Sequence, residues 1–310
     1  RNLQFVNQVA TILEDEFPNM RIGMFAYGAT RNPPANITAH RNVVVWYCPI
    51  ERCSCHPLDC GPINAEFYRI PEGIWTWKQI ARKVYVYDYG WGNLLTTAST
   101  VRAMRRLGVN GVMVDSIPNI QTGFGFLRYW LWAQSLRRPG WNADAGLREF
   151  MGAYYGAAAA PLDRYLRLIA DHRSYEPLPQ ERADTWRVYS GGEGFVPESV
   201  GRWTLVHTCH LTYRRPTNQA IDQAYALFEQ ARHVTSADSK ARRHVESARM
   251  ELQLFMLEHL PADDGRLKRE LEGLIMVSEQ LEMRTVAGIP LSQFREKIHM
   301  KIGITPTNEP

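Results

Sequence analysis

The first half of the chain repeats one pattern, in which a short apolar stretch alternates with a segment whose apolar residues recur at helical spacing. The apolar stretches are RIGMFAYG, VVVWYCP, KVYVYDYG and GVMVDS, which begin at residues 21, 43, 83 and 111. Stretches that are apolar on both faces and alternate with helices are typical of parallel βα units. The pattern therefore predicts four parallel strands with connecting helices.

Two architectures contain such units, a doubly wound sheet and a (β/α)₈ barrel. YGWGNLL and TGFGFLR contain G-x-G, but neither completes the G-x-G-x-x-G turn of a dinucleotide-binding sheet. We interpret residues 1–155 as half of a (β/α)₈ barrel, because four βα units are half of the eight.

The second half of the chain, residues 156–310, is predicted to be a mainly α-helical domain. A helical stretch in residues 143–172 is interrupted between Gly156 and Pro161. Two long amphipathic helices are expected between Thr217 and Leu260, and DDGRLKRELEGLIMVSEQLEM predicts another.

Charge and hydropathy exclude several partners. The 36 basic and 32 acidic residues give a net charge of +4, which is too balanced to indicate a nucleic-acid or membrane surface. No apolar run approaches the roughly 20 residues that span a bilayer. The nine Trp and 14 Tyr, most of them before residue 160, fit either a core or a surface that stacks against sugar rings.

Four of the five cysteines lie close together, at Cys48, Cys53, Cys55 and Cys60, with His56 among them. Structural zinc usually takes paired C-x2-C turns, and the spacing here is C-x4-C-x-C-x4-C. The spacing therefore favours a disulfide or partly unpaired thiols over zinc, and we expect no metal and no cofactor.

Candidate site residues follow from the position of the strand ends, because ligands of a barrel bind at the carboxyl ends of its strands. The side chains at those ends are Tyr27, Trp46, Cys48, Asp88, Tyr89, Trp91 and Asp115. Aromatic rings for stacking, together with carboxylates for hydroxyl groups, indicate a carbohydrate-binding cleft. Asp88 could instead cap a loop, and Asp115 could pair with an arginine. Glycoside hydrolysis needs two carboxyl groups, for which these two aspartates are only weak candidates.

Several segments between Phe5 and Tyr165 resemble the domain-of-unknown-function family 4838, whose bacterial members look like glycoside hydrolases related to α-glucuronidases and hexosaminidases. The matching segments are FVNQVATIL, FAYGATRNPPANI, NVVVWYCPIERCSCHPL, WKQIARKVYVYDY, GVNGVMVDS and EFMGAYYGAAAAPLDRYL. The resemblance covers about half of the chain. It implies a hydrolase that acts on an oligo- or polysaccharide, with an extracytoplasmic or secreted parent protein.

The resemblance also implies that residues 1–155 are the C-terminal half of the family's (β/α)₈ barrel, and that the other half lies outside this chain. Family members usually begin with a β-domain and the first barrel strands, whereas this chain opens on the helix before what resembles the fifth strand. We therefore expect the catalytic acid upstream of residue 1, the missing N-terminal half of the barrel as a partner, and no hydrolase activity from this chain alone. The family often has a glutamate where Asp115 stands. The alternatives are a non-catalytic carbohydrate-binding or scaffold protein, and a helical interaction module with a vestigial barrel.

Overall fold

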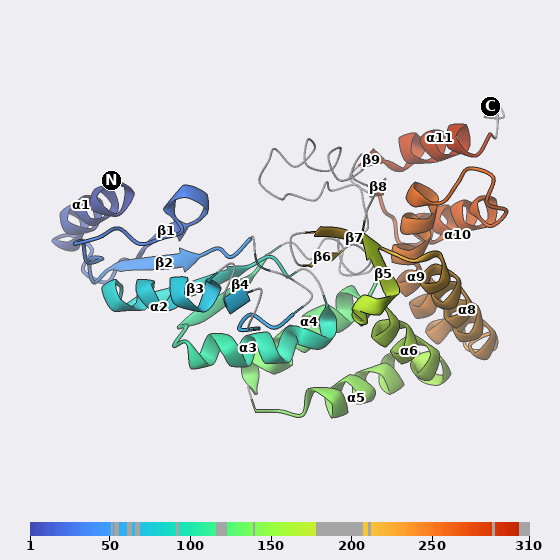
Figure 1. Ribbon diagram of the computed structural model, residues 1–310, viewed down its shortest axis with the longest axis horizontal. Coiled ribbons are helices and arrows are strands. Elements are labelled where there is room, and N and C mark those ends of the chain that lie inside the picture. The colour runs from blue at the N-terminus through green and yellow to red at the C-terminus, as the bar shows by residue number, and fades with distance from the viewer. Residues whose placement is uncertain are drawn as a thin grey trace. The chain divides into compact units, whose positions relative to one another are not determined.

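The computed structural model describes residues 1–50, 52, 56–60, 64–65, 69–90, 93–115, 123–138, 140–177, 207–209, 212–286 and 289–303 (Figure 1). The chain divides into two compact units. Unit 1 comprises Arg1–Trp91, Thr96–Ile117 and Leu131–Trp141, and unit 2 comprises Gly92–Leu95, Pro118–Trp130 and Asn142–Pro310. Within the described residues, no helix is both long and apolar enough to cross a bilayer.

Unit 1 is built on a four-stranded sheet with the order β1-β2-β3-β4, in which every neighbouring pair is parallel. The strands are β1 (Ile22–Ala26), β2 (Val43–Tyr47), β3 (Lys83–Asp88) and β4 (Gly111–Val114). The helices are α1 (Asn2–Glu14), α2 (Ile70–Ile80), α3 (Thr97–Arg106) and the part of α4 (Gly125–Arg137) from Leu131 onward. The short 3₁₀ helices η1 (Gly28–Thr30) and η3 (Leu94–Thr96) follow β1 and β3. The predicted parallel βα units are confirmed.

One face of this sheet forms the core of unit 1. Successive side chains of a strand point to opposite faces, and alternate residues of each strand are buried against the helices. The strand side chains in this core are Met24, Ala26, Val43, Val45, Tyr47, Val84 and Val86. The helix side chains that pack with them include Leu3, Ala10, Ile70, Ile74, Trp77, Val101, Ala103, Met104 and Trp132. The hydrophobic effect of this burial holds the helices on one side of the sheet.

The apolar residues of α1 are divided between this core and the surface. Leu3 and Ala10 are buried, whereas the side chains of Phe5 and Ile12 are 65% and 74% exposed. α1 therefore carries two apolar stripes. The stripe of Leu3, Val6 and Ala10 packs against the sheet, and the stripe with Phe5 and Ile12 lies on the surface.

Unit 2 is mainly helical, as predicted. Its helices are α5 (Ala143–Tyr155), α6 (Ala159–Ala170), α8 (Asn218–Val234), α9 (Ser239–His259), α10 (Leu267–Gln280) and α11 (Leu291–Lys301). The expected interruption is the 3₁₀ helix η4 (Gly156–Ala158), which begins at Gly156 with a φ of +54°. Thr217 and Asp238 cap α8 and α9 through their side chains, because each accepts hydrogen bonds from amides of the first turn.

The sequence did not predict the short strands of unit 2, because strands of so few residues carry no readable alternation. β5 (Tyr175–Pro177), β7 (Thr212–Pro216) and β6 (His207–Cys209) form an antiparallel sheet in that order, and η5 (His172–Ser174) precedes it. β8 (Thr285–Val286) pairs with β9 (Ile289–Pro290).

Candidate functional site

The face of the sheet opposite the helices carries aromatic side chains. Phe25, Trp46 and Tyr85 occupy one row across β1, β2 and β3, and Trp46 meets Tyr85 edge to face with ring centroids 4.8 Å apart. Phe25 meets Tyr87 in the same way at 5.5 Å. Since Phe25 is 57% exposed and Met113 of β4 is 45% exposed, the described part of the chain leaves this face largely open. We call it the open face.

At the carboxyl ends of the strands, the open face carries a group of polar and aromatic side chains that we call the strand-end cluster. Its members are Tyr27, Cys48, Tyr87, Tyr89 and Asp115. The rings of Tyr87 and Tyr89 lie 5.3 Å apart at 67°. The Asp115 carboxylate lies close enough to the Tyr87 hydroxyl to interact with it.

The phenols of Tyr87 and Tyr89 are protonated over the whole physiological range. Burial raises the pKa of Tyr87 to about 12, with further contributions from the Asp115 carboxylate and from Cys48. Burial also raises the pKa of Tyr89, and the nearby Cys48, Tyr27, Tyr87 and Asp115 add to this effect. Protonated phenols beside a carboxylate offer both donors and acceptors to a ligand rich in hydroxyl groups.

Asp88, the other predicted carboxylate, is engaged within the chain. It belongs to the strand row that faces the helices, and it is fully buried. Nη2 of Arg52 lies 3.0 Å from its Oδ1 and 2.9 Å from its Oδ2. The amide of Gly90 donates to Oδ1 at 2.8 Å. Asp88 therefore ties the loop after β2 to the loop after β3.

Cys48 is a buried thiol, and its Sγ lies 3.4 Å from the carbonyl oxygen of Trp46. Cys60 is also a thiol. Cys53, Cys55 and Trp91 lie outside the described residues, so the structure does not place them. Within the described part of the chain, no three His, Cys, Asp or Glu side chains come together as ligands for a metal ion.

The structure thus brings four of the predicted residues, Tyr27, Cys48, Tyr89 and Asp115, to one place. Trp46 lies on the same open face, where its ring packs on Tyr85. The sequence reasoning missed Tyr87, although the period-two alternation of KVYVYDY places it on the face of Tyr89. It also missed Arg52, for which no local pattern exists.

Residues 1–167 match the family model described as Domain of unknown function (DUF4838). The chain belongs to this family. The match spans more than half of the chain, and it contains the whole parallel sheet and the strand-end cluster. Neither the curated proteins nor the solved structures include a match to the chain. The resemblance seen in the sequence is therefore confirmed at the level of the family.

Proposed function

We propose that the chain is part of a carbohydrate-active protein of glycoside-hydrolase type, in which the strand-end cluster forms one wall of the sugar-binding cleft. The observation that carries this proposal is the composition of the cluster, with three tyrosines and one carboxylate at the carboxyl end of a parallel sheet. Tyrosine rings stack on the apolar faces of sugars, and their hydroxyl groups bind sugar hydroxyls. Parallel sheets bind their ligands at this end.

The proposal includes a partner for the open face, namely the other half of a (β/α)₈ barrel. In a closed barrel, the helices cover one face of the sheet and the side chains of the other face fill the interior. The sheet of unit 1 has this division, with aliphatic residues under the helices and aromatic residues on the open face. The exposed stripe with Phe5 and Ile12 on α1, next to the edge strand β1, supplies a surface for a preceding βα unit.

The carboxylates limit the chemistry that this chain performs by itself. Within the described residues of the strand-end cluster, Asp115 is the only carboxylate, because Asp88 is buried against Arg52. Hydrolysis of a glycosidic bond uses two carboxyl groups, one as the acid and the other as base or nucleophile. We therefore expect this chain to bind sugars without cleaving them. The same observation favours a second candidate, a carbohydrate-binding protein that performs no chemistry.

The test has two parts. Calorimetry measures the binding of a panel of neutral and acidic oligosaccharides to the 310-residue chain, and assays with aryl glycosides measure turnover. We expect saturable binding and no turnover. Tyr87→Phe removes only the hydroxyl that meets Asp115, and it should weaken binding by about three- to tenfold, the effect of one hydrogen bond. The matched control is Tyr85→Phe, on the same strand and face but farther from the strand end.

Two results would contradict the proposal. One is a panel in which no oligosaccharide binds, and the other is equal affinity in the Tyr87→Phe and Tyr85→Phe variants. Turnover of an aryl glycoside by the isolated chain would show that its own residues supply both carboxyl groups. Turnover only after addition of the N-terminal part of the family's fold would favour the hydrolase over the binding protein.

A further inference from the structure

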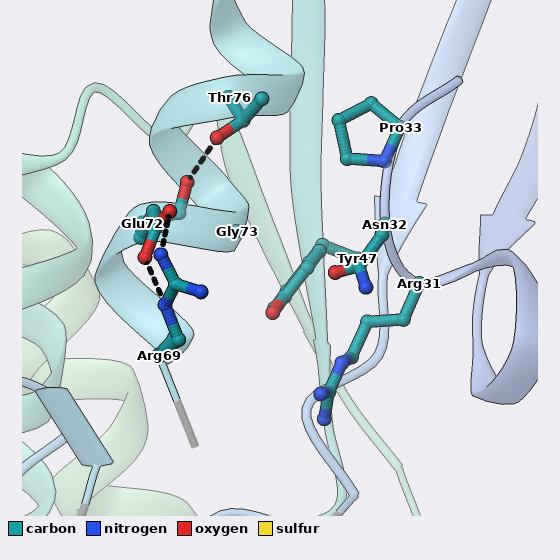
Figure 2. A pocket seen from close by; sticks show the side chains of 8 residues that line it. All are labelled: Arg31, Asn32, Pro33, Tyr47, Arg69, Glu72, Gly73 and Thr76. Carbon is teal, nitrogen blue, oxygen red and sulfur yellow. Dashed lines mark hydrogen bonds and ion pairs between the residues drawn. The ribbon is translucent and has the colours of Figure 1, made fainter. Parts of the chain in front are cut away.

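A cavity lies on the other side of the sheet from the strand-end cluster, where the helices pack. It is a cleft of about 310 Å³ between the loop after β1, the end of β2 and the first turns of α2 (Figure 2). The side chains and backbone of eight residues line it: Arg31, Asn32, Pro33, Tyr47, Arg69, Glu72, Gly73 and Thr76. A volume near 300 Å³ is at the lower end of small-molecule sites in proteins.

The backbone of Arg31 is fixed from two sides. Its amide donates to the carbonyl oxygen of Gly28 at 3.1 Å, which closes the 3₁₀ turn after β1. Its carbonyl oxygen accepts a hydrogen bond from the indole Nε1 of Trp77 at 2.6 Å. Because Trp77 is buried in the core, the start of the Arg31 side chain is anchored to α2 across the cleft.

Arg69 lies on the opposite wall, at the N-cap position of α2. Its backbone adopts the left-handed conformation with φ 51° and ψ 37°, which is uncommon outside glycine and asparagine. Its Nε and Nη2 are paired with the Glu72 carboxylate. Figure 2 shows the third nitrogen, Nη1, turned away from Glu72 toward the cleft. Glu72 therefore orients the guanidinium and leaves one edge of it for a ligand.

The floor of the cleft is formed by Tyr47 and Gly73. The Tyr47 ring packs against the backbone of α2, where a Cβ at Gly73 would lie 2.9 Å from Cζ of the ring. Its hydroxyl group points into the space between Arg31 and Arg69 (Figure 2). The absence of a side chain at residue 73 thus allows a phenol hydroxyl to reach the cleft.

We propose that this cleft binds the oxyanion of a small molecule, either a phosphate or a carboxylate group. Among the described residues of its wall, the charged side chains are two arginines and one glutamate, which together carry a net charge of +1. Guanidinium groups bind phosphate and carboxylate oxygens through paired N–H donors. The Tyr47 hydroxyl adds a neutral donor, and the N-terminus of α2 adds a favourable dipole. The proposal is independent of the sugar wall, because the two sites lie on opposite faces of the sheet.

The experiment is an NMR titration of the ¹⁵N-labelled chain with inorganic phosphate. The reporters are the indole N–H of Trp77 and the Nε–H groups of Arg31 and Arg69. We expect these signals to shift saturably at millimolar phosphate. The affinity for phosphate should fall as sodium chloride is added, because salt screens the charges. Titration with galacturonate tests whether the cleft binds a carboxylate group. Titration with neutral galactose tests whether hydroxyl groups alone are enough for binding.

Three variants test the assignment. Arg31→Met and Arg69→Met should each weaken phosphate binding by about tenfold or more, because each removes a charge-assisted contact. Glu72→Gln should strengthen binding, since it removes a negative charge from the wall, and loss of folding cannot produce that result. The matched control is Arg82→Met, an exposed arginine of the same unit outside the cleft, which should leave binding unchanged.

The proposal is overturned if neither phosphate nor galacturonate gives saturable shifts. It is equally overturned if galactose binds as well as galacturonate, or if the Arg31 and Arg69 variants bind phosphate as the parent chain does. An unchanged or lower affinity in the Glu72→Gln variant would contradict its electrostatic basis. Thermal unfolding of each variant establishes that the fold is intact.

Discussion

Asp88 and Asp115 are neighbours across β3 and β4, yet their carboxylates serve opposite faces of the sheet. The amide of Asp115 donates to the carbonyl oxygen of Asp88 at 2.7 Å. The Asp88 side chain turns to the helix side and meets Arg52, whereas that of Asp115 meets the Tyr87 hydroxyl on the open face. One step of strand alternation therefore separates a structural carboxylate from a carboxylate of the candidate site.

The first prediction concerns the buried pair of Arg52 and Asp88. Asp88→Asn keeps the shape of the side chain but leaves the guanidinium of Arg52 without its counter-charge. Breaking one partner of a buried ion pair costs about 3–5 kcal/mol, so the free energy of unfolding should fall by that order in urea denaturation. The control is Asp59→Asn, which breaks the exposed pair with Arg106 and should cost less than about 1 kcal/mol. Equal stability of the two variants would show that the buried pair of Arg52 and Asp88 does not stabilise the fold more than an exposed pair does.

The second prediction concerns the titration of Tyr87. Its pKa in the folded chain, about 12, lies above the value near 10 of an unfolded tyrosine. The stabilisation linked to this shift is therefore fully present below about pH 10 and is lost as the pH rises through about 12. Asp115→Asn should lower the pKa of Tyr87 only in part, because burial is the larger cause.

The measurement is the ¹³Cζ chemical shift of labelled tyrosines between neutral and alkaline pH, with Tyr87→Phe to assign the signal. The matched control is Asp144→Asn, in the first turn of α5, which should leave the Tyr87 titration unchanged. A Tyr87 pKa that does not move in Asp115→Asn would mean that the two side chains do not interact in solution.

The third prediction concerns a buried ion pair in unit 2. Nη2 of Arg249 lies 2.6 Å from Oε1 of Glu270, and both side chains are almost fully buried. Burial lowers the pKa of Arg249 and raises that of Glu270, so both groups are held in their charged forms at a cost. Among the described residues, Arg249 Nε and Glu270 Oε2 have no hydrogen-bond partner.

Replacing either partner alone should therefore destabilise the chain. Arg249→Met leaves the Glu270 carboxylate buried without its main counter-charge and should cost about 3–5 kcal/mol. Glu270→Leu should cost less, because Glu229 remains 3.1 Å from Nη2 of Arg249. Combining the two substitutions should recover much of the loss caused by Arg249→Met. A double-mutant cycle by chemical denaturation measures the coupling. If the double variant is as unstable as the sum of the single variants, the two groups do not depend on each other.

The fourth prediction concerns the close packing of Tyr47 on α2. Gly73→Ala should destabilise the chain by about 1–3 kcal/mol, as is usual when a methyl group is forced into a packed core. Tyr47→Phe removes the hydroxyl oxygen, which is the nearest atom, and should recover part of the loss in the double variant. Gly152→Ala is the control, because a Cβ at this helical glycine meets no atom within 4 Å, and it should be neutral or stabilising.

The sequence predicted the parallel βα units and the main helices because both rest on local periodicity. Choosing site residues by their place at a strand end was less exact, since Asp88 and Tyr89 are adjacent in sequence and point to opposite faces. Alternation along KVYVYDY would have separated them and found Tyr87. Arg52 lies 36 residues from Asp88, and contacts over such distances leave no local pattern. The cleft beside Arg31 and Arg69 likewise depends on the path of two loops.

The Trp46 and Tyr85 rings of the open face extend over glycines of the outer strands. A Cβ at Gly23 would lie 3.1 Å from Nε1 of Trp46, and one at Gly111 would lie 3.2 Å from Cε2 of Tyr85. Each ring thus occupies the space that a side chain at the facing glycine of the neighbouring strand would need. Across the family, residues 23 and 46 should consequently vary as a pair, and so should residues 85 and 111. Where residue 23 or 111 is larger than glycine, residue 46 or 85 should be smaller than the aromatic residue found here.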